Sequence, residues 1–222
     1  MRLLYHLPLS PYSRKVRLAL TEKGLDFELK LEKVWDRRPE FLALNPAAQV
    51  PVLVEESGFA IPDSTAICEY LDEAYPATPL IGRTLAERVE CRRLVAWFDG
   101  KFAREVDDNL LFEKLMRRLL GRGEPEAGAI RAGFVNLRHH LAYLGWLAEH
   151  RKWLAGDTLT LADLTAAAHL SSLDFLGDVD WSICASAKEW YARVKSRPSF
   201  RALLADRVGG MTPPAHYANL DF

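Results

Sequence analysis

Short apolar runs alternate with a one-sided helical pattern over the first 31 residues. The runs LLYHL (3–7) and FELKL (27–31) predict strands, the second because apolar and polar residues alternate in it. Between them, residues 11–23 predict a helix that begins at Pro11 and is ended by Gly24. A strand, a helix and a second strand in this order predict a parallel unit.

The helix predicted over residues 11–23 has two kinds of face. Val16, Ala19 and Leu20 form an apolar stripe that we expect to face the core. The basic side chains lie off this stripe, and we expect them to face solvent; they are Arg14, Lys15 and Arg17.

A hairpin and a further helix complete the N-terminal pattern. After a loop rich in Pro and Asn, VPVLV (50–54) and GFAI (58–61) predict two strands joined by a short turn. Residues 64–75 then predict a helix that Pro76 stops. The order βαβ then ββα predicts a four-stranded mixed sheet with helices, and the boundary of this α/β unit is expected near PATPLIG (76–82).

The rest of the chain shows helical patterns and no credible strand, so the predicted fold is α/β followed by all-α. We expect an N-terminal domain over residues 1–80, an all-helical domain over 81–206 and an extended tail over 207–222, where Gly-Gly and Pro-Pro pairs prevent a regular element. Thr160 and Asp163 form a capping box that we assign to folding. The predicted helices span residues 84–120, 129–150, 160–176, 186–196 and 198–206.

Composition and charge exclude several classes of function. The formal net charge of -1 gives no overall attraction to nucleic acid or to an anionic membrane. No apolar run approaches the roughly 20 residues that span a bilayer, and the first residues show no secretory signal. The three cysteines have no paired spacing, and the histidines form no HExxH-type pair. We therefore expect a cytoplasmic protein without a metal or a resident cofactor.

The junction YHLPLSPYSRKVRLAL (5–20) is a candidate for chemistry. Ser10 and Pro11 start a helix, where unpaired N–H groups and about half a positive charge favour an anion. A serine before a proline is also a very common helix cap. The two interpretations are compatible, and the sequence of the junction alone does not choose between them.

Four motifs, taken in order, resemble the glutathione S-transferase family. They are SPYSRKVRL at the first helix, NPAAQVPVL before the third strand, DS at residues 63–64, and LTLADL at the start of a buried helix. The resemblance covers almost the whole chain. It implies a thioredoxin-like N-terminal domain, an all-helical C-terminal domain and a homodimer.

The resemblance also implies a site for glutathione as a co-substrate. Ser10 matches the hydroxyl that holds the glutathione thiolate in serine-type members, and Ser13 is a second candidate. A hydroxyl bonded to a charged acceptor supplies about 1.5–3 kcal/mol, comparable with the roughly 2.7 kcal/mol that lowers a thiol pKa by two units. The remaining glutathione contacts implied by the resemblance are Gln49, Val50, Pro51, Asp63 and Ser64.

Each of these contacts has a structural alternative. Val50-Pro51 matches a cis proline of the family, but it also suits a tight turn into an edge strand. Asp63 and Ser64 can equally cap a helix. Family members more often carry Glu or Gln at position 63 and a basic residue at position 49. Four aromatic residues could line an electrophile pocket or belong to the core, namely Trp97, Phe98, Phe102 and Phe112.

A second resemblance is to a group of alphaproteobacterial cell-division proteins within the family, which bind the filament protein FtsZ. It rests on LVAWFDGKF (94–102), YLGWL (143–147) and residues 196–222. It implies a dimeric binding module that regulates FtsZ filaments and constriction and is recruited to the division site. The alternative is a transferase that conjugates glutathione to electrophiles, which the motifs around Ser10 favour.

Two regions are candidates for contacting a protein partner. The long helix carries a charged patch, which could otherwise be an ordinary solvated face; it consists of Glu113, Lys114, Arg117 and Arg118. The tail sets apolar side chains beside a charge, as a short docking peptide does. Its candidates are Tyr217, Leu220, Asp221 and Phe222. In the alternative interpretation, the tail folds back over its own domain or over a dimer partner.

Overall fold

The structure is a computed structural model, which describes residues 1–220. Its first elements are the strand β1 (Arg2–His6), the helix α1 (Pro11–Glu22) and the strand β2 (Phe27–Leu31). β1 and β2 pair in parallel, with Arg2 opposite Phe27. The predicted strand–helix–strand unit is therefore confirmed.

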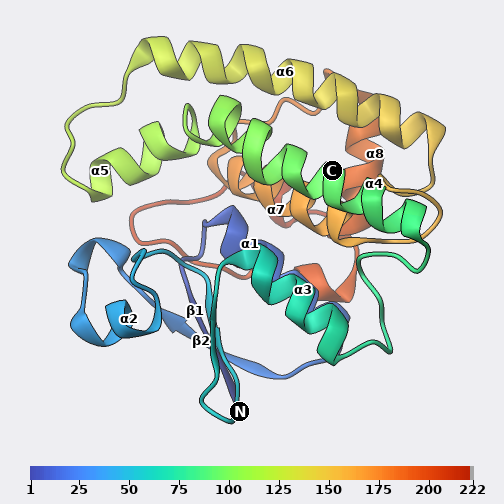
Figure 1. The fold of residues 1–222 in the computed structure, drawn as a ribbon. Helices are drawn as coiled ribbons and strands as arrows, with labels where there is room; N and C mark the ends of the chain where they lie inside the picture. Colours follow the sequence, from blue (N-terminus) through green and yellow to red (C-terminus); the bar gives the residue numbers. More distant parts are fainter. Residues whose placement is uncertain (221–222) are drawn as a thin grey trace.

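Two short strands and a helix complete the N-terminal sheet. β3 (Val52–Val54) pairs antiparallel with β1, and β4 (Ala60–Pro62) pairs antiparallel with β3, which gives the order β2-β1-β3-β4. α3 (Ser64–Ala74) follows. Figure 1 shows α1 and α3 lying between the sheet and the remaining helices. This is the predicted four-stranded mixed sheet of a thioredoxin-like domain.

The connection between β2 and β3 is more ordered than the expected loop. It contains a 3-10 turn (Val34–Asp36) and the short helix α2 (Pro39–Leu44). Phe41 of α2 is buried, and its ring centroid lies 5.5 Å from that of Tyr5 on β1. A helix of six residues is too short to show a periodic pattern, so packing of Phe41 on the sheet, not local sequence, explains why it forms.

The second part of the chain is helical, as predicted. The helix α7 lies at its centre with nearly every residue buried, and α1 and α4 pack against it. Figure 1 shows α6 and α4 on the side of the molecule away from the sheet. The elements are α4 (Leu85–Ala96), the π-helical stretches η2 (Trp97–Asp107) and η3 (Phe112–Met116), α5 (Arg117–Leu119), α6 (Ala127–His150), α7 (Leu161–Leu176), α8 (Ala185–Lys195), a 3-10 turn (Pro198–Phe200) and α9 (Arg201–Leu204).

The capping box at the start of α7 forms as predicted. The carboxylate of Asp163 accepts hydrogen bonds from the backbone N–H of Thr160 at 3.0 Å and from that of Leu154 at 2.9 Å. It also accepts a bond from the indole N–H of Trp190 at 3.0 Å. The buried carboxylate therefore ties α7 to two other segments, which is a folding role. Among residues 1–220, none of the helices is both long enough and apolar enough to cross a membrane.

The basic side chains of α1 are buried, and the prediction that they face solvent is wrong. Arg14 and Lys15 are 0% exposed and Arg17 is 3% exposed. The apolar stripe identified only one face of α1, whereas buried residues lie all round the helix. The opposite face packs on the helical domain, and acidic residues more than 80 positions along the chain neutralise it.

Asp206 neutralises two of these buried cations. It lies at the end of the α9 segment, and both of its oxygens accept hydrogen bonds from Arg17, at 2.8 and 2.9 Å. Arg14 approaches the same carboxylate at 3.3 Å. Lys15 is ion-paired with Asp99 of η2. The helical domain thus supplies the countercharges that the buried cations of α1 need.

The tail folds back over its own domain, which was the alternative interpretation. Tyr217 is 0% exposed, its hydroxyl donates to the Leu203 carbonyl at 3.1 Å, and its ring lies 5.2 Å from that of Phe175. A 3-10 turn forms at Ala215–Ala218, so the expectation that the tail holds no regular element is wrong. Packing of Tyr217 explains this turn. Asp221 and Phe222 lie outside the described residues.

We predict that Asp206→Asn lowers the free energy of unfolding by about 3–5 kcal/mol, because it leaves Arg14 and Arg17 buried without their shared carboxylate. Urea unfolding followed by circular dichroism measures the change. The matched control is Asp157→Asn, since Asp157 is exposed and its loss should cost less than about 0.5 kcal/mol. Equal stability of the two variants would contradict a structural role for the Asp206 cluster.

Candidate functional site

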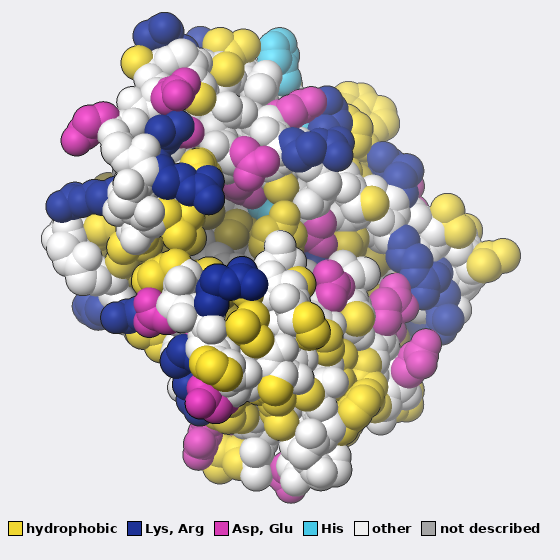
Figure 2. Space-filling view, turned by 60° about the vertical axis from the view of Figure 1, so that its left-hand side comes forward, with side chains coloured by type: hydrophobic (Ala, Val, Ile, Leu, Met, Phe, Trp, Pro, Cys, Tyr) yellow, Lys and Arg dark blue, Asp and Glu magenta, His cyan; other side chains and the backbone are white. Residues whose placement is uncertain are grey.

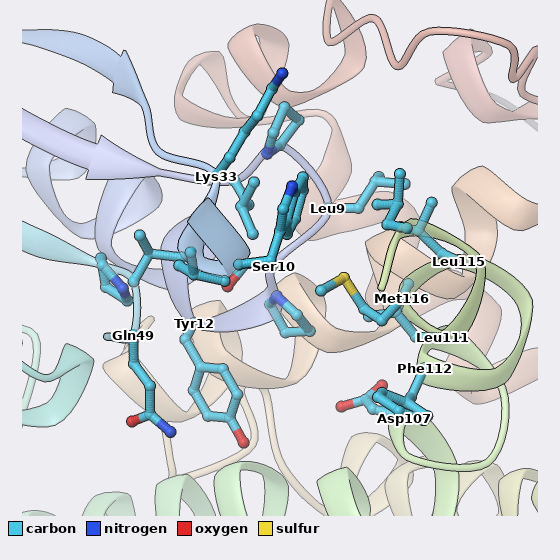
Figure 3. Close-up of a pocket in the computed structure, with 18 of the residues that line it drawn as sticks. Leu9, Ser10, Tyr12, Lys33, Gln49, Asp107, Leu111, Phe112, Leu115 and Met116 are labelled. Carbon is cyan, nitrogen blue, oxygen red and sulfur yellow. The ribbon is translucent and has the colours of Figure 1, made fainter. Parts of the chain in front are cut away.

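A cavity of about 1070 Å³ lies between the N-terminal domain and the π-helical segments. Figure 2 shows it as a hollow with hydrophobic side chains on its walls and charged side chains near its rim. The helical wall is apolar and is formed mainly by Leu111, Phe112, Leu115 and Met116. Figure 3 shows these side chains facing Leu9, Ser10 and Tyr12 of the N-terminal wall.

Ser10 lies in the N-terminal wall and caps α1. Its Oγ accepts a hydrogen bond from the backbone N–H of Ser13 at 3.2 Å, so the cap interpretation is confirmed. Because Oγ accepts in this bond, the hydroxyl proton remains available to donate to a ligand in the cavity. The two interpretations of Ser10 are therefore compatible in the structure. Ser13, the second candidate, is 0% exposed and bonds the Leu7 N–H through its own Oγ at 3.4 Å.

The turn that carries Ser10 is held by Arg14. The guanidinium of Arg14 donates to the Pro8 carbonyl at 2.7 Å and to Ser171 on α7 at 2.8 Å. It also donates to the Tyr217 hydroxyl at 3.1 Å. One buried side chain therefore connects the turn beside the cavity, the central helix and the tail.

The Val50-Pro51 peptide bond is cis, as the family resemblance implied. The segment before it is held by Asn45, whose side chain donates to the Gln49 carbonyl at 2.9 Å and accepts from the Ala47 N–H at 3.1 Å. Gln49, Val50 and Pro51 all line the cavity.

Asp63 and Ser64 lie at the start of α3 on the same cavity. Asp63 caps the helix: one of its oxygens accepts hydrogen bonds from Thr65 at 2.8 Å and Ala66 at 2.9 Å. Its φ of 75° is unusual for a residue other than glycine and is compatible with local strain at a binding site. Of the residues expected to bind glutathione, the structure brings together Ser10, Gln49, Val50, Pro51, Asp63 and Ser64 around one cavity.

A buried charge cluster lies behind the cavity, and the sequence analysis missed it. Nδ1 of His169 is 2.5 Å from an oxygen of Asp107, and Nε2 is 3.1 Å from an oxygen of Asp99. Both ring nitrogens face carboxyl groups, an arrangement that favours the imidazolium form, in which both nitrogens donate. Lys15 pairs with Asp99 as well. The cluster thus holds two cations and two anions, and Asp107 lines the cavity.

The pKa values follow from this geometry. Burial alone would lower the pKa of His169, but Asp107 and Asp99 outweigh it and raise the pKa to about 9. Burial favours a higher pKa for Asp99, but Lys15 and His169 overcome it and lower the pKa. A sequence signal did exist, because polar Asp99, Asp107 and His169 interrupt otherwise apolar helix faces.

The four aromatic residues considered for an electrophile pocket do not all lie at the cavity. Phe112 lines the cavity. Phe98 and Phe102 are each 1% exposed and belong to the core. Trp97 donates from its indole N–H to His140 at 3.1 Å, away from the cavity lining. Of these four aromatic residues, Phe112 alone lines the cavity.

The proposed protein-binding residues of the long helix are mostly paired within the chain. Glu113 is 5% exposed and forms a salt bridge with Arg117 at 2.8 Å. Lys114 forms a salt bridge with Asp178. Arg118 is exposed. In the tail, Tyr217 is buried and Leu220 is half-buried.

We expect His169 to make the protein less stable as the pH rises above neutrality. Its folded pKa of about 9 lies above the ordinary value of 6.5, so its contribution is complete below pH 6.5 and is lost as the pH rises towards 9. Between pH 6.5 and 8, the free energy of unfolding should fall by about 1–2 kcal/mol more in the wild type than in His169→Gln.

Urea unfolding at several pH values measures this difference. Other buried groups also titrate near the edges of this window, because burial lowers the pKa of His6 to about 4 and that of Lys195 to about 8. These groups are present in both proteins, so the difference between the two profiles reports His169. Above pH 8, relief of the Lys195 penalty acts in the opposite direction. Parallel pH profiles for wild type and variant would show that His169 is not held as an imidazolium.

Two family models match the chain. The model described as the glutathione S-transferase N-terminal domain matches residues 4–79, and that of the C-terminal domain matches residues 136–198.

Relatives match over the full length. "FtsZ-localized protein A" of Caulobacter vibrioides is 50% identical over 224 residues, covering 100% of this chain and 98% of that protein. The structure called FzlA from C. crescentus superposes with a TM-score of 0.97 at 50% identity, covering 100% of this chain and 99% of that one. A glutathione S-transferase structure from Rhodospirillum rubrum F11 superposes with a TM-score of 0.98 at 56% identity, covering 100% of both chains.

Proposed function

Because the chain belongs to the glutathione S-transferase family, we propose that it serves the cell-division branch of that family, as a module that binds FtsZ and regulates its filaments and constriction. The observation that carries the proposal is the 50% identity with FtsZ-localized protein A over 100% of this chain. Full coverage matters because it includes the tail, which the matched C-terminal family model does not reach.

The packing of the tail supports this proposal. Residues 207–209 form part of the cavity wall, and Tyr217 further along is bonded to Arg14. The tail is thus built into the body of the molecule at two places. Such an arrangement suits a scaffold that presents the end of the chain, whereas a conjugating enzyme has no evident need of it.

The surface around Arg118 is the proposed contact with FtsZ. Arg118 is exposed at the end of the long helical pattern, beside the salt bridge of Arg117 with Glu113. Glu113 is paired with Arg117, and Lys114 is paired with Asp178. Arg118 is therefore left to meet an acidic partner surface. Tyr217, by contrast, would act by anchoring the tail so that Leu220, Asp221 and Phe222 are presented.

We also propose that the protein is a cytoplasmic homodimer recruited to the division site. Leu85 and Val89 on α4 are 80% and 60% exposed, and Phe59 in the β3–β4 hairpin is 57% exposed. Leu85 and Val89 are four positions apart on one helix and so share a face, and an exposed apolar patch there favours contact with another protein surface. A second copy of the chain is the occupant that the family resemblance implies.

The purified protein should co-sediment with FtsZ polymerised in GTP, and not with FtsZ in GDP. Ser10→Ala should co-sediment equally well, because the cavity hydroxyl plays no part in a surface contact. Arg118→Glu should weaken binding by about tenfold or more, since it places an acid against the proposed acidic partner surface.

The matched control for that variant is Arg131→Glu, an exposed arginine on α6 with the same change of charge. It should retain wild-type binding. Failure of the wild-type protein to pellet with FtsZ polymer would reject the division proposal as a whole. Equal loss in both arginine variants would reject only the assignment of the contact to Arg118.

The second candidate function is glutathione conjugation, which the geometry of the cavity favours. Ser10 is placed to donate a hydrogen bond into a cavity that also holds the cis Val50-Pro51 segment and the capped start of α3. A hydroxyl there would stabilise the thiolate of glutathione, and the α3 N-terminus would receive a carboxylate. Phe112 would contact the electrophile.

If this activity is present, glutathione should give a saturable signal in isothermal titration calorimetry. Ser10→Ala should then lower kcat/KM with 1-chloro-2,4-dinitrobenzene by about 10- to 100-fold, the loss of a charge-assisted hydrogen bond. Ser57→Ala, in an exposed turn, is the control and should have no effect. The absence of any heat of binding at millimolar glutathione would remove this candidate and leave the division proposal untouched.

A further inference from the structure

Two exposed cations, Lys33 and Arg207, line the cavity and form what we call its cationic rim. Figure 2 shows Lys and Arg side chains beside the hollow. Within residues 1–220, neither side chain of the cationic rim has a carboxylate partner; Arg207 donates to the backbone carbonyls of Ala205 and Asp206, at 3.2 Å each. Because a guanidinium stays protonated in proteins, the rim carries a fixed positive charge that a ligand can reach.

The acids of the cavity lie elsewhere on its lining. Asp63 caps α3 and accepts two backbone N–H groups there. Asp107 faces His169 behind the helical wall, and Asp108 is its neighbour. Burial raises the pKa of Asp107 and of Asp108, which disfavours their charged forms. Figure 3 shows Lys33 and Asp107 on opposite sides of the cavity. An anion can therefore approach the cationic rim without meeting these carboxyl groups.

Large apolar side chains of the cavity wall are incompletely covered. Leu31 and Leu119 both line the cavity and are 55% and 46% exposed. Leu115 and Met116 add to the same apolar lining. Hydrocarbon placed against these side chains would remove their surface from water, which is favourable. The cavity of about 1070 Å³ has room for a drug-sized ligand. The occupant that suits it has a hydrocarbon body and an anionic group.

The cationic rim is also part of the tail. Residues 207–209 line the cavity, and the Met211 N–H donates to the Val208 carbonyl at 3.1 Å directly after them. Further along, Tyr217 is buried and accepts a hydrogen bond from Arg14. A ligand held at the cationic rim would therefore fix the start of the tail, while Tyr217 fixes it beyond the turn.

We propose that the cavity binds a hydrophobic anion, whose acidic group pairs with Lys33 and Arg207 and whose hydrocarbon body packs on the apolar wall, and that this binding fastens the tail. Because the anion contacts residues 207–209 only while the tail is docked, it must stabilise the docked state by linkage. The inference uses neither Arg118 nor Ser10, so it depends neither on FtsZ binding nor on conjugation.

The binding test uses the full-length protein and three probes with the same ten-carbon chain, decanoate, 1-decanol and decylamine, in isothermal titration calorimetry at pH 7. Decanoate should bind at least about fivefold more tightly than 1-decanol, because its carboxylate gains two partly exposed ion pairs. Decylamine should bind most weakly, since the cationic rim repels it. Equal affinity of decanoate and 1-decanol would overturn the proposal and show a cavity that recognises hydrocarbon alone.

The variants Lys33→Gln and Arg207→Gln each remove one charge of the cationic rim. Each should lower the affinity for decanoate about threefold or more and leave that for 1-decanol unchanged. The matched control is Arg201→Gln, an exposed arginine on α9 outside the cavity lining, which should bind both probes as the wild type does. A folded protein with both rim substitutions that kept the full preference for decanoate would also overturn the proposal.

Hydrogen exchange followed by mass spectrometry tests the effect on the tail. Saturating decanoate should slow exchange of the amides of residues 211–219 at least about threefold relative to saturating 1-decanol, because it stabilises the docked tail. Arg207→Gln should lose this difference, and Arg201→Gln should keep it. Decanoate that binds the wild type as expected without slowing exchange in the tail would show that the tail is not fastened by the ligand.

Discussion

The fold depends on neutralising the buried basic face of α1. Arg14, Lys15 and Arg17 lie between the sheet and the helical domain, where an unpaired charge would be prohibitive. Asp206 and Asp99, both from the helical domain, provide the countercharges. The interface between the two parts of the molecule is therefore specified by charge as well as by apolar packing. These ion pairs set the position of α1 against the helical domain.

The candidate site follows from that arrangement. α1 begins at Ser10, and the turn before it is bonded to Arg14, so the position of the hydroxyl depends on the same buried contacts that join the two domains. Behind the opposite wall, Lys15 and Asp99 continue into the His169 cluster that ends at Asp107. Both walls of the cavity are thus backed by buried ion pairs that join α1 to the helical domain.

Much of the architecture could be predicted from local pattern, and the reasons for the failures are specific. The strands, the main helices and the capping box of Thr160 and Asp163 are local features whose periodicity or spacing is visible in the sequence. On the N-terminal wall of the cavity, the residues expected to contact glutathione were found through motifs of the family. The burial of Arg14 and Arg17 was missed because their partner, Asp206, is about 190 positions away. The Asp107–His169 contact was missed for the same reason, since it joins positions 62 residues apart.

The place of the tail has a mechanical consequence. Residues 207–209 line one side of the cavity. The Arg14 guanidinium donates hydrogen bonds both to the Tyr217 hydroxyl and to the Pro8 carbonyl. Tension applied at residue 220 would reach the hydrogen bond of the Asn219 N–H with the His216 carbonyl and then the phenol of Tyr217, whose partner Arg14 holds the turn bearing Ser10. A tether at the end of this chain would in that way transmit pulling force to the interior of the protein.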